Sequence, residues 1–270
     1  MTETFDTFKP RHKLVSQYVD YYYLDVKPSN EVTEFVCFPH HNTTISIYKS
    51  HRRAANRDMI FDPDAASFQI FTPVREQVLR VRQIGKVHRI VIVFHALGIQ
   101  QFYRDLDFSD YILDHPFLNQ GELEQLFTQT KVDVLTEILD QFLWSRYVEF
   151  KNETLGYSTA QVFANYEEFS VEGLANDLRI SRRHLNRLFN RHLGVSIKKF
   201  HKIVLLRKLL EKKLFSSPQE TFTRLAYELN YSDQAHLNKA FKALTQNSPN
   251  QFLKKGTLLG NEDTFWHILK

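Results

Sequence analysis

The sequence predicts an α+β protein. It has a small N-terminal antiparallel β-barrel or β-sheet domain with accompanying helices, and a C-terminal all-α domain. Three observations support this. Short segments rich in aromatic and β-branched residues fill residues 18–94, helical periodicity follows, and a pair of helices is repeated after Gly156. Because domains commonly have 100–200 residues, we divide the 270 residues into domains 1–153 and 154–270.

Six segments of the first domain are short and are separated by prolines and a glycine, among them Pro39, Pro63 and Gly85. Aromatic and β-branched residues favour strands, and strands without long helices between them form small antiparallel sheets or barrels. The six predicted strands are Tyr18–Val26, Glu31–Cys37, Thr43–Tyr48, Phe68–Thr72, Gln77–Arg82 and Val87–Phe94.

Three helices are predicted after the strands, at Leu97–Leu106, Leu118–Thr128 and Val132–Tyr147. In the last of them apolar residues recur at helical spacing, and we take this helix as a candidate dimer surface. The polar segment Lys151–Ser158 then marks the domain boundary.

The second domain contains a repeat. Leu174 matches Leu225 at an offset of 51 residues, whereas Phe189 matches Phe241 at an offset of 52, so the second copy has one extra residue at its turn. Each copy has the pattern of a helix, a short turn and a second helix. The predicted N-caps are Ser170 and Ser181 in the first copy and Ser232 in the second. We place the first helix-turn-helix at about residues 170–193, a joining helix at 197–215 and the second helix-turn-helix at about 221–245.

The second helix of each copy has an apolar stripe on one face and hydrogen-bond donors on the other. Arginine donates to guanine, and Asn or Gln can pair with adenine, so such a helix suits the DNA major groove. An ordinary surface helix mixes Glu with Lys, yet residues 181–193 contain no acidic residue. The predicted base-contacting residues are Arg182, Arg183, Asn186, Arg187, Gln234, Ala235, Asn238 and Lys239.

Charge is distributed unevenly along the chain. The net charge is +4, but residues 156–270 hold 18 basic and 10 acidic side chains, and residues 181–213 hold 11 basic side chains against one acidic. This asymmetry favours a polyanion as the partner of the second domain. The joining helix of 19 residues spans about 28 Å at 1.5 Å per residue, close to the spacing of about 34–36 Å between successive major-groove segments.

These features resemble the C-terminal domain of the AraC/XylS family of transcription regulators. The resemblance covers about residues 156–255 and rests on SVEGLANDLRISRRHLNRLF and LAYELNYSDQAHLNKAFKALTQNSPNQF, although Asn230 and Gln246 stand where the family usually has glycine. It implies a seven-helix domain that binds double-stranded DNA as one unit. Because Ala235 cannot form a hydrogen bond through its side chain, we expect the first copy to dominate specificity. The residues that we expect to contact phosphates are Ser181, Arg191, Lys198, Lys199, Ser232 and Lys242.

The first domain resembles the β domains of the same family more loosely, through FVCFPHHNTTISIY and VHRIVIVFHALGIQQFY. The resemblance implies binding of a small-molecule effector, formation of a homodimer, or both, and contact with RNA polymerase if the protein is an activator. The C-terminal tail, Thr257–Lys270, lies beyond the family domain, and we expect it to pack on the body of the protein.

Other classes of function fit less well. Cys37 is the single cysteine, the histidines lack the spacing of a metal motif, and no glycine loop could cradle a phosphate, so we expect no catalytic residue, metal or cofactor. We find no signal peptide and no membrane span, which favours the cytoplasm. We therefore expect a DNA-binding regulator, with an architectural DNA-binding protein or an enzyme with a catalytic β domain as the alternatives.

Overall fold

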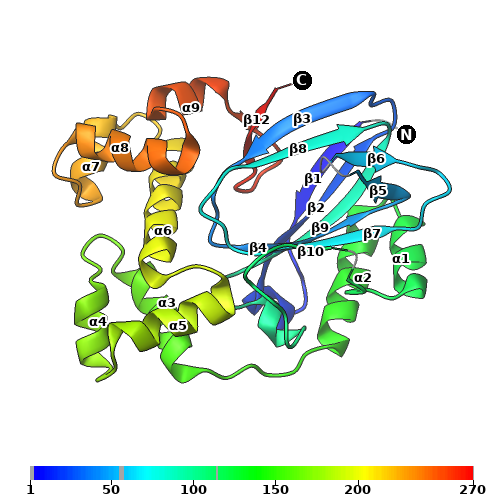
Figure 1. The fold of residues 1–270 in the computed structure, drawn as a ribbon. Coiled ribbons are helices and arrows are strands. Elements are labelled where there is room, and N and C mark those ends of the chain that lie inside the picture. The colour runs from blue at the N-terminus through cyan, green and yellow to red at the C-terminus, as the bar shows by residue number, and fades with distance from the viewer. Residues whose placement is uncertain (1–2, 55–57, 114, 270) are drawn as a thin grey trace.

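The computed structural model describes residues 3–54, 58–113 and 115–269. It places a β-rich part beside a helical part (Figure 1). The strands are β1 (Thr4–Phe8), β2 (Val19–Lys27), β3 (Val32–Cys37), β4 (Thr43–Tyr48), β5 (His51–Arg53), β6 (Met59–Phe61), β7 (Phe68–Thr72), β8 (Leu79–Ile84), β9 (Val87–Phe94), β10 (Ile112–Leu113), β11 (Thr257–Leu258) and β12 (Phe265–Ile268). The helices are α1 (Gln120–Phe127), α2 (Val132–Ser145), α3 (Glu153–Ala164), α4 (Val171–Asp177), α5 (Arg182–Leu193), α6 (Ile197–Glu211), α7 (Phe222–Glu228), α8 (Gln234–Thr245) and α9 (Pro249–Lys255).

The strands form two six-stranded sheets, in the orders β1-β2-β9-β4-β7-β10 and β11-β12-β3-β8-β6-β5. Of the strand pairs among the described residues, only β6 with β8 is parallel. The predicted combination of a β-rich N-terminal part and a helical C-terminal part is therefore confirmed.

Strand β2 shows how the first sheet is packed, because successive side chains of a strand point to opposite faces. Tyr22 and Leu24 belong to the core that this sheet shares with α1 and α2. Tyr21 and Tyr23 belong to a second cluster, which includes Phe35 of β3 in the other sheet. The first sheet is thus buried on both faces.

The six predicted strands correspond to β2, β3, β4, β7, β8 and β9, and the predicted helices at 118–128 and 132–147 correspond to α1 and α2. The predicted helix Leu97–Leu106 is wrong, because only a 3₁₀ turn forms, at Ile99–Gln101. Leu97 has a left-handed backbone with φ of 65°. A Cβ on Gly98 would lie 2.1 Å from the Tyr18 carbonyl oxygen, so this segment passes close to the backbone before β2 instead of continuing as a helix.

The apolar stripe of α2 lies inside the protein. Leu135, Leu139 and Leu143 are fully buried in the core beneath the first sheet. The exposed residues of the helix include Glu137 and Trp144. The stripe that suggested a dimer surface is therefore occupied by the chain's own sheet.

The C-terminal tail packs on the body, as expected, and it does so as part of a sheet. Strand β12 pairs with β3 in antiparallel register, with His267 opposite Val36. Trp266 stacks on Phe35 with ring centroids 4.6 Å apart and is only 7% exposed. The predicted domain division at residue 153 stays a prediction, but the tail joins the β-rich part, although it follows the helical part in sequence.

The helices around each of the two helix-turn-helix copies, here called the first unit and the second unit, also contact the β-rich part. Val74, in the loop before β8, is buried in the core of the first unit. Phe38, after β3, packs against Phe252 of α9 with ring centroids 4.4 Å apart. Between them, the buried Arg207 of α6 donates hydrogen bonds to the carbonyl oxygens of Phe38 (2.9 Å) and Pro39 (2.6 Å). Helix α6, which joins the two units, is therefore hydrogen-bonded to the β-rich part through Arg207.

Candidate nucleic-acid interface

The second helix of each copy carries the predicted base contacts, and we call it the recognition helix. The first recognition helix, α5, has clear local signals at both of its ends. The Ser181 side chain accepts a hydrogen bond from the His184 amide (3.1 Å), which confirms the predicted N-cap. Gly194 ends the helix with φ of 75°, a left-handed conformation that favours glycine. Leu185 and Phe189 are fully buried in the core of the first unit. The apolar stripe therefore fixes which face of α5 remains outside.

That outer face carries the predicted base-contacting residues, and we call it the first reading face. Arg182, Arg183 and Arg187 are exposed, and Asn186 is half-buried between them and the core. No carboxylate occurs on α5. The structure thus brings these four predicted residues together on one exposed surface that donates hydrogen bonds.

Two contacts restrain the arginines of this face. His184 Nδ1 lies 2.8 Å from a guanidinium nitrogen of Arg187 and can accept its hydrogen bond. Glu172, on α4, lies 3.9 Å from the Arg182 guanidinium, and both side chains are about two-thirds exposed. Exposed ion pairs of this kind contribute little to stability, so we regard the second contact as an influence on orientation.

The second recognition helix, α8, begins one residue later than predicted. Ser232 is not its N-cap; instead the Asp233 side chain accepts a hydrogen bond from the His236 amide (2.7 Å). The extra residue of the second copy lies in this turn, so the capping position moves to Asp233. Ser232 Oγ lies 3.3 Å from the His236 ring. Its predicted phosphate contact stays a prediction.

The end of α8 keeps the geometry of the first unit without a glycine. Gln246 has φ of 63°, close to the 75° of Gly194 at the corresponding end of α5. Asn230, in the turn before α8, also has a left-handed backbone, with φ of 57°. Both departures from the family pattern therefore occur at positions that retain the left-handed conformation.

The outer face of α8 is the second reading face. Ala235 and Lys239 are exposed, whereas Gln234 and Asn238 are half-buried. The exposed Lys242 lies one turn further along. This face offers one cation among its four predicted base contacts, against three on the first reading face. The two units are alike in their cores and unlike in their reading faces.

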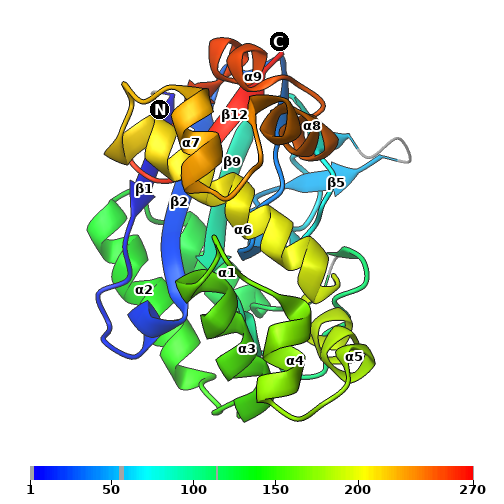
Figure 2. The same ribbon diagram turned by 90° about the vertical axis from the view of Figure 1, so that its left-hand side faces the viewer.

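Helix α6 joins the two units (Figure 2). Its regular α-helical part is 15 residues long, or about 22 Å, and a π-helical segment continues it over Lys212–Ser216. Its N-cap is Ser196, which accepts a hydrogen bond from the Lys199 amide (3.3 Å). Most of its side chains are buried, because both units and the β-rich part pack around it.

The predicted phosphate-contacting residues differ in availability. Arg191, Lys198 and Lys242 are exposed, and the structure gives each of them no ion pair among the described residues. Lys199 Nζ, in contrast, lies 2.6 Å from Glu76 Oε1 in the loop before β8. One predicted phosphate contact is therefore already neutralised by the β-rich part.

Two residues at this surface, Glu172 and Thr223, are not among those predicted from the sequence. Each contacts the first side chain of a recognition helix, and the two positions are related by the offset of 51 residues that relates the first helices of the repeat. The repeat offset relates these two positions to each other, but nothing in the sequence marks either of them as a contact of a recognition helix.

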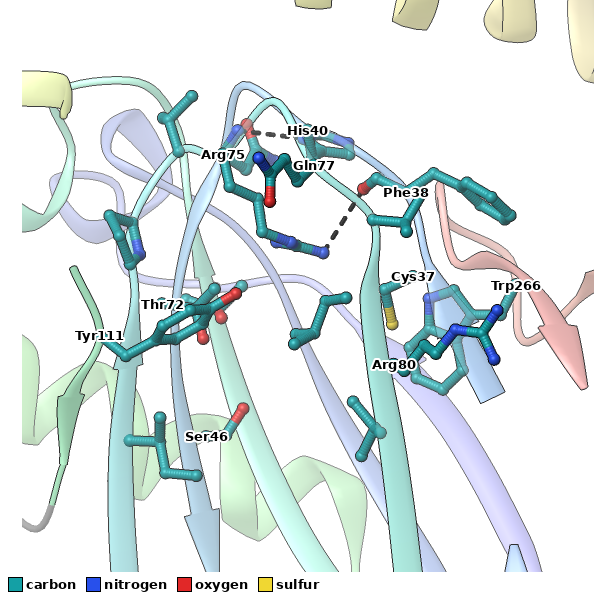
Figure 3. Close-up of a pocket in the computed structure, with 18 of the residues that line it drawn as sticks. Cys37, Phe38, His40, Ser46, Thr72, Arg75, Gln77, Arg80, Tyr111 and Trp266 are labelled. Atoms are coloured by element: carbon teal, nitrogen blue, oxygen red, sulfur yellow. Dashed lines mark hydrogen bonds between the residues drawn. The ribbon is translucent and has the colours of Figure 1, made fainter. Parts of the chain in front are cut away.

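A second candidate site is a cavity of about 780 Å³ in the β-rich part, with walls from both sheets, α6 and the tail. Figure 3 shows Arg75 extending into it toward the Phe38 carbonyl oxygen, at 3.5 Å. Arg75 Nε is buried and has no hydrogen-bond partner among the described residues. Thr72, Ser46 and Tyr111 line the cavity across from the guanidinium. An anionic group in this cavity would find a donor that the protein itself leaves unused.

Cys37 and Asp263 are two of the groups beside this cavity whose pKa values are shifted. Burial raises the pKa of the Cys37 thiol, so the unreactive protonated form is favoured. Burial alone would raise the pKa of Asp263, but the neighbouring Arg207 and His40 outweigh it and hold that pKa well below its usual range. Asp263 is therefore a carboxylate, and it joins the tail to α6 through its 2.9 Å contact with Arg207.

Comparison with known families decides what the helical part is. A family model described as a helix-turn-helix domain matches residues 174–255, which extend from α4 to the end of α9. This region is an AraC-type helix-turn-helix domain. The AraC-type domain includes both recognition helices and α6, and it ends just before the tail hairpin.

The relatives of the AraC-type domain are named as regulators. The chain is 27% identical over 154 residues to an uncharacterized helix-turn-helix-type transcriptional regulator of Haemophilus influenzae, covering 53% of this chain and 51% of that protein. It is 24% identical over 126 residues to the Msm operon regulatory protein of Streptococcus mutans, covering 45% of each. The chain thus spans about half the length of the curated relatives it matches.

Comparison with solved structures finds ToxT from Vibrio cholerae, with 11% identity, a TM-score of 0.48, and coverage of 86% of this chain and 98% of that chain. The C-terminal domain of AraT from Geobacillus stearothermophilus is 21% identical with a TM-score of 0.36, covering 42% of this chain and 93% of that one. In the described residues no helix is both long and apolar enough to cross a membrane, and no three His, Cys, Asp or Glu residues are placed to hold a metal ion.

Proposed function

We propose that this protein is a sequence-specific DNA-binding transcription regulator whose DNA binding is controlled by a small molecule in its β-rich part. The first reading face supports the proposal most directly. Arg182, Arg183 and Arg187 project from one side of a helix that has no carboxylate, within an AraC-type domain. Arginines placed in this way suit the guanine edges of a major groove.

The two units divide the work. The first unit specifies the sequence because its three arginines and Asn186 each match a base edge. The second unit mainly anchors the domain, because Ala235 can offer a thymine methyl contact at most and Lys239 is its one predicted base-contacting cation. We therefore expect an asymmetric binding site.

Selection of binding sites by the full chain from a randomised pool of double-stranded DNA tests this function. The expected result is an enriched motif in which one half is strongly conserved and a weaker half lies about 10–10.5 base pairs away. Binding that depends steeply on salt but enriches no motif would instead identify an architectural DNA-binding protein.

We assign the control of DNA binding to the cavity because Arg75 extends into it (Figure 3). Its buried Nε has no hydrogen-bond partner in the described part of the chain, and a buried unpaired donor is costly until a ligand satisfies it. The next residue, Glu76, forms the ion pair with Lys199, and Val74 is buried in the core of the first unit. A small anionic ligand bound to Arg75 would therefore act on a loop that already contacts the DNA-binding domain.

Thermal-shift measurements with a panel of small carboxylates and phosphates test the control. They should use the full chain, because residues 1–155 alone lack β12 and the tail wall of the cavity. A ligand that raises the melting temperature of the wild type and of Lys131→Gln, but not of Arg75→Gln, supports the site; Lys131 is exposed and does not line the cavity. Equal shifts in both variants would place the ligand elsewhere.

A further inference from the structure

In the second unit, one side chain of the first helix holds the first side chain of the recognition helix. Thr223 Oγ1, on α7, donates a hydrogen bond to Gln234 Oε1, on α8, over 2.7 Å. Thr223 is exposed and Gln234 is half-buried. The contact therefore lies at the surface that would face DNA, beside the second reading face.

The first unit has a contact at the same place. Glu172 is the second residue of α4 and Arg182 is the first residue of α5, and their charged groups are 3.9 Å apart. Thr223 is likewise the second residue of α7, and Gln234 the first of α8. The offsets of 51 and 52 residues that relate the two copies connect these pairs, so the arrangement belongs to the repeat.

We propose that Thr223 is a positioning residue that orients the Gln234 amide and thereby sets which base edge Gln234 recognises. Glu172 occupies the corresponding position for Arg182. The inference rests on the proposed function, because it matters only if the reading faces contact bases.

The chemistry of the amide determines the preference. A glutamine side chain has one acceptor oxygen and two N–H donors. With Oε1 turned toward Thr223, the donors face outward. The base edge that best suits two donors is guanine, which presents the acceptors N7 and O6 in the major groove. A freely rotating Gln234 could instead pair with adenine, which needs the glutamine oxygen as an acceptor.

The two pairs differ in strength, which decides where to test the idea. The Glu172–Arg182 contact is long, and both side chains are about two-thirds exposed, so solvent screens it. The Thr223–Gln234 hydrogen bond is short, and one partner is half-buried. The measurable effect is therefore expected in the second unit.

The test is site selection from randomised DNA with the full chain, four single variants of α7 and α8, one double variant and Arg183→Ala. Gln234→Ala identifies the base pair that Gln234 recognises. Thr223→Val removes the hydroxyl while preserving the branched shape, whereas Thr223→Ser retains the hydroxyl. Tyr227→Phe removes an exposed hydroxyl from the same helix and serves as a control. Melting temperatures confirm that each variant is folded.

We expect Thr223→Val to change the preference at the base pair identified by Gln234→Ala, reducing discrimination for guanine over adenine about two- to tenfold, the effect of one hydrogen bond. Thr223→Ser and Tyr227→Phe should retain the wild-type preference. The double variant Thr223→Val with Gln234→Ala should select like Gln234→Ala alone, because a positioning residue acts only through its partner.

Three results would overturn the inference. If Gln234→Ala changes one base pair and Thr223→Val leaves it unchanged, or if the two substitutions act additively, Thr223 does not position Gln234, and the regulator function stands. If Gln234→Ala changes no base pair while Arg183→Ala does, α8 does not contact bases, and the inference fails together with the assignment of the second reading face. Loss of selection by the wild type itself would mark failure of the proposed function.

Discussion

Glu76 Oε1 lies 2.6 Å from Lys199 Nζ, so a carboxylate of the β-rich part neutralises a lysine predicted to contact DNA phosphate. Glu76→Gln should therefore strengthen binding to all DNA sequences and steepen the dependence of log K on log salt by about 0.9, the contribution of one released cation. Fluorescence anisotropy titrations over a range of salt would measure both. Glu137→Gln, which removes an exposed carboxylate from α2, is the control. An unchanged salt slope would mean that Lys199 does not contact phosphate.

Lys198, the neighbour of Lys199, is exposed and has no ion pair among the described residues. Lys198→Ala should weaken binding to every sequence alike and reduce the salt slope by about one, because a phosphate contact positions the protein without distinguishing bases. Affinities for the selected site and for a scrambled site of equal length would be compared. A loss confined to the selected site would refute the phosphate assignment.

In contrast to Lys198, Arg183 and Arg187 should affect which DNA sequence is preferred. Arg183→Ala or Arg187→Ala should relax the preference at one or two base pairs, at a cost of about 1–3 kcal/mol for each, because a bidentate contact to guanine is lost. Selection from randomised DNA measures this directly. If both variants retain wild-type selectivity, α5 is not the helix that lies in the major groove.

Trp266 tests whether the tail stabilises the β-rich part. It is 7% exposed, stacks on Phe35, and lies 5.5 Å from the Arg89 guanidinium. Trp266→Ala should lower the free energy of unfolding by about 3–5 kcal/mol, the usual cost of truncating a buried aromatic residue. Urea denaturation provides the measurement, with Leu258→Ala, at a position 40% exposed, as the matched control in the same hairpin. A similar small loss in both variants would show that the tail is dispensable.

The lowered pKa of His88 predicts that the free energy of unfolding depends on pH. Burial, followed by the nearby charges of Lys49 and His51, lowers its pKa from 6.5 to about 4. The unfolded chain binds this proton more tightly than the folded protein does, so the folded state loses stability as the pH falls from about 6.5 to about 4. In His88→Gln this contribution is absent, and unfolding free energies measured between those pH values should fall less steeply than in the wild type. Equal slopes would show that His88 titrates normally.

The helical part could be predicted closely from the sequence because its signals are local. Ser170 and Ser181 cap their helices as predicted, and the leucine and phenylalanine stripes mark the buried faces. The one local error, Ser232 in place of Asp233, arises because two good capping residues are adjacent where the second copy has its extra residue. Pattern alone cannot choose between neighbouring caps.

The β-rich part was predicted less completely because its remaining order depends on contacts distant in sequence. Strand β12 exists because it pairs with β3, and nothing in its four residues specifies that partner. The failed helix at Leu97–Leu106 illustrates the same limit, since the side chain of Gln100 donates instead to the His192 carbonyl oxygen of α5 (2.7 Å). The cavity and the Glu76–Lys199 pair likewise require the tertiary structure.

The pairing of β12 with β3 has a consequence for how the protein is made. A ribosome synthesises β3 near the start of the chain and β12 only after both helix-turn-helix units. Until then the edge of β3 that β12 will cover, including Phe35, stays without its partner strand. Unpaired edges are the sites at which nascent β proteins join neighbouring chains. Synthesis of β12 is therefore the event that allows this edge to close.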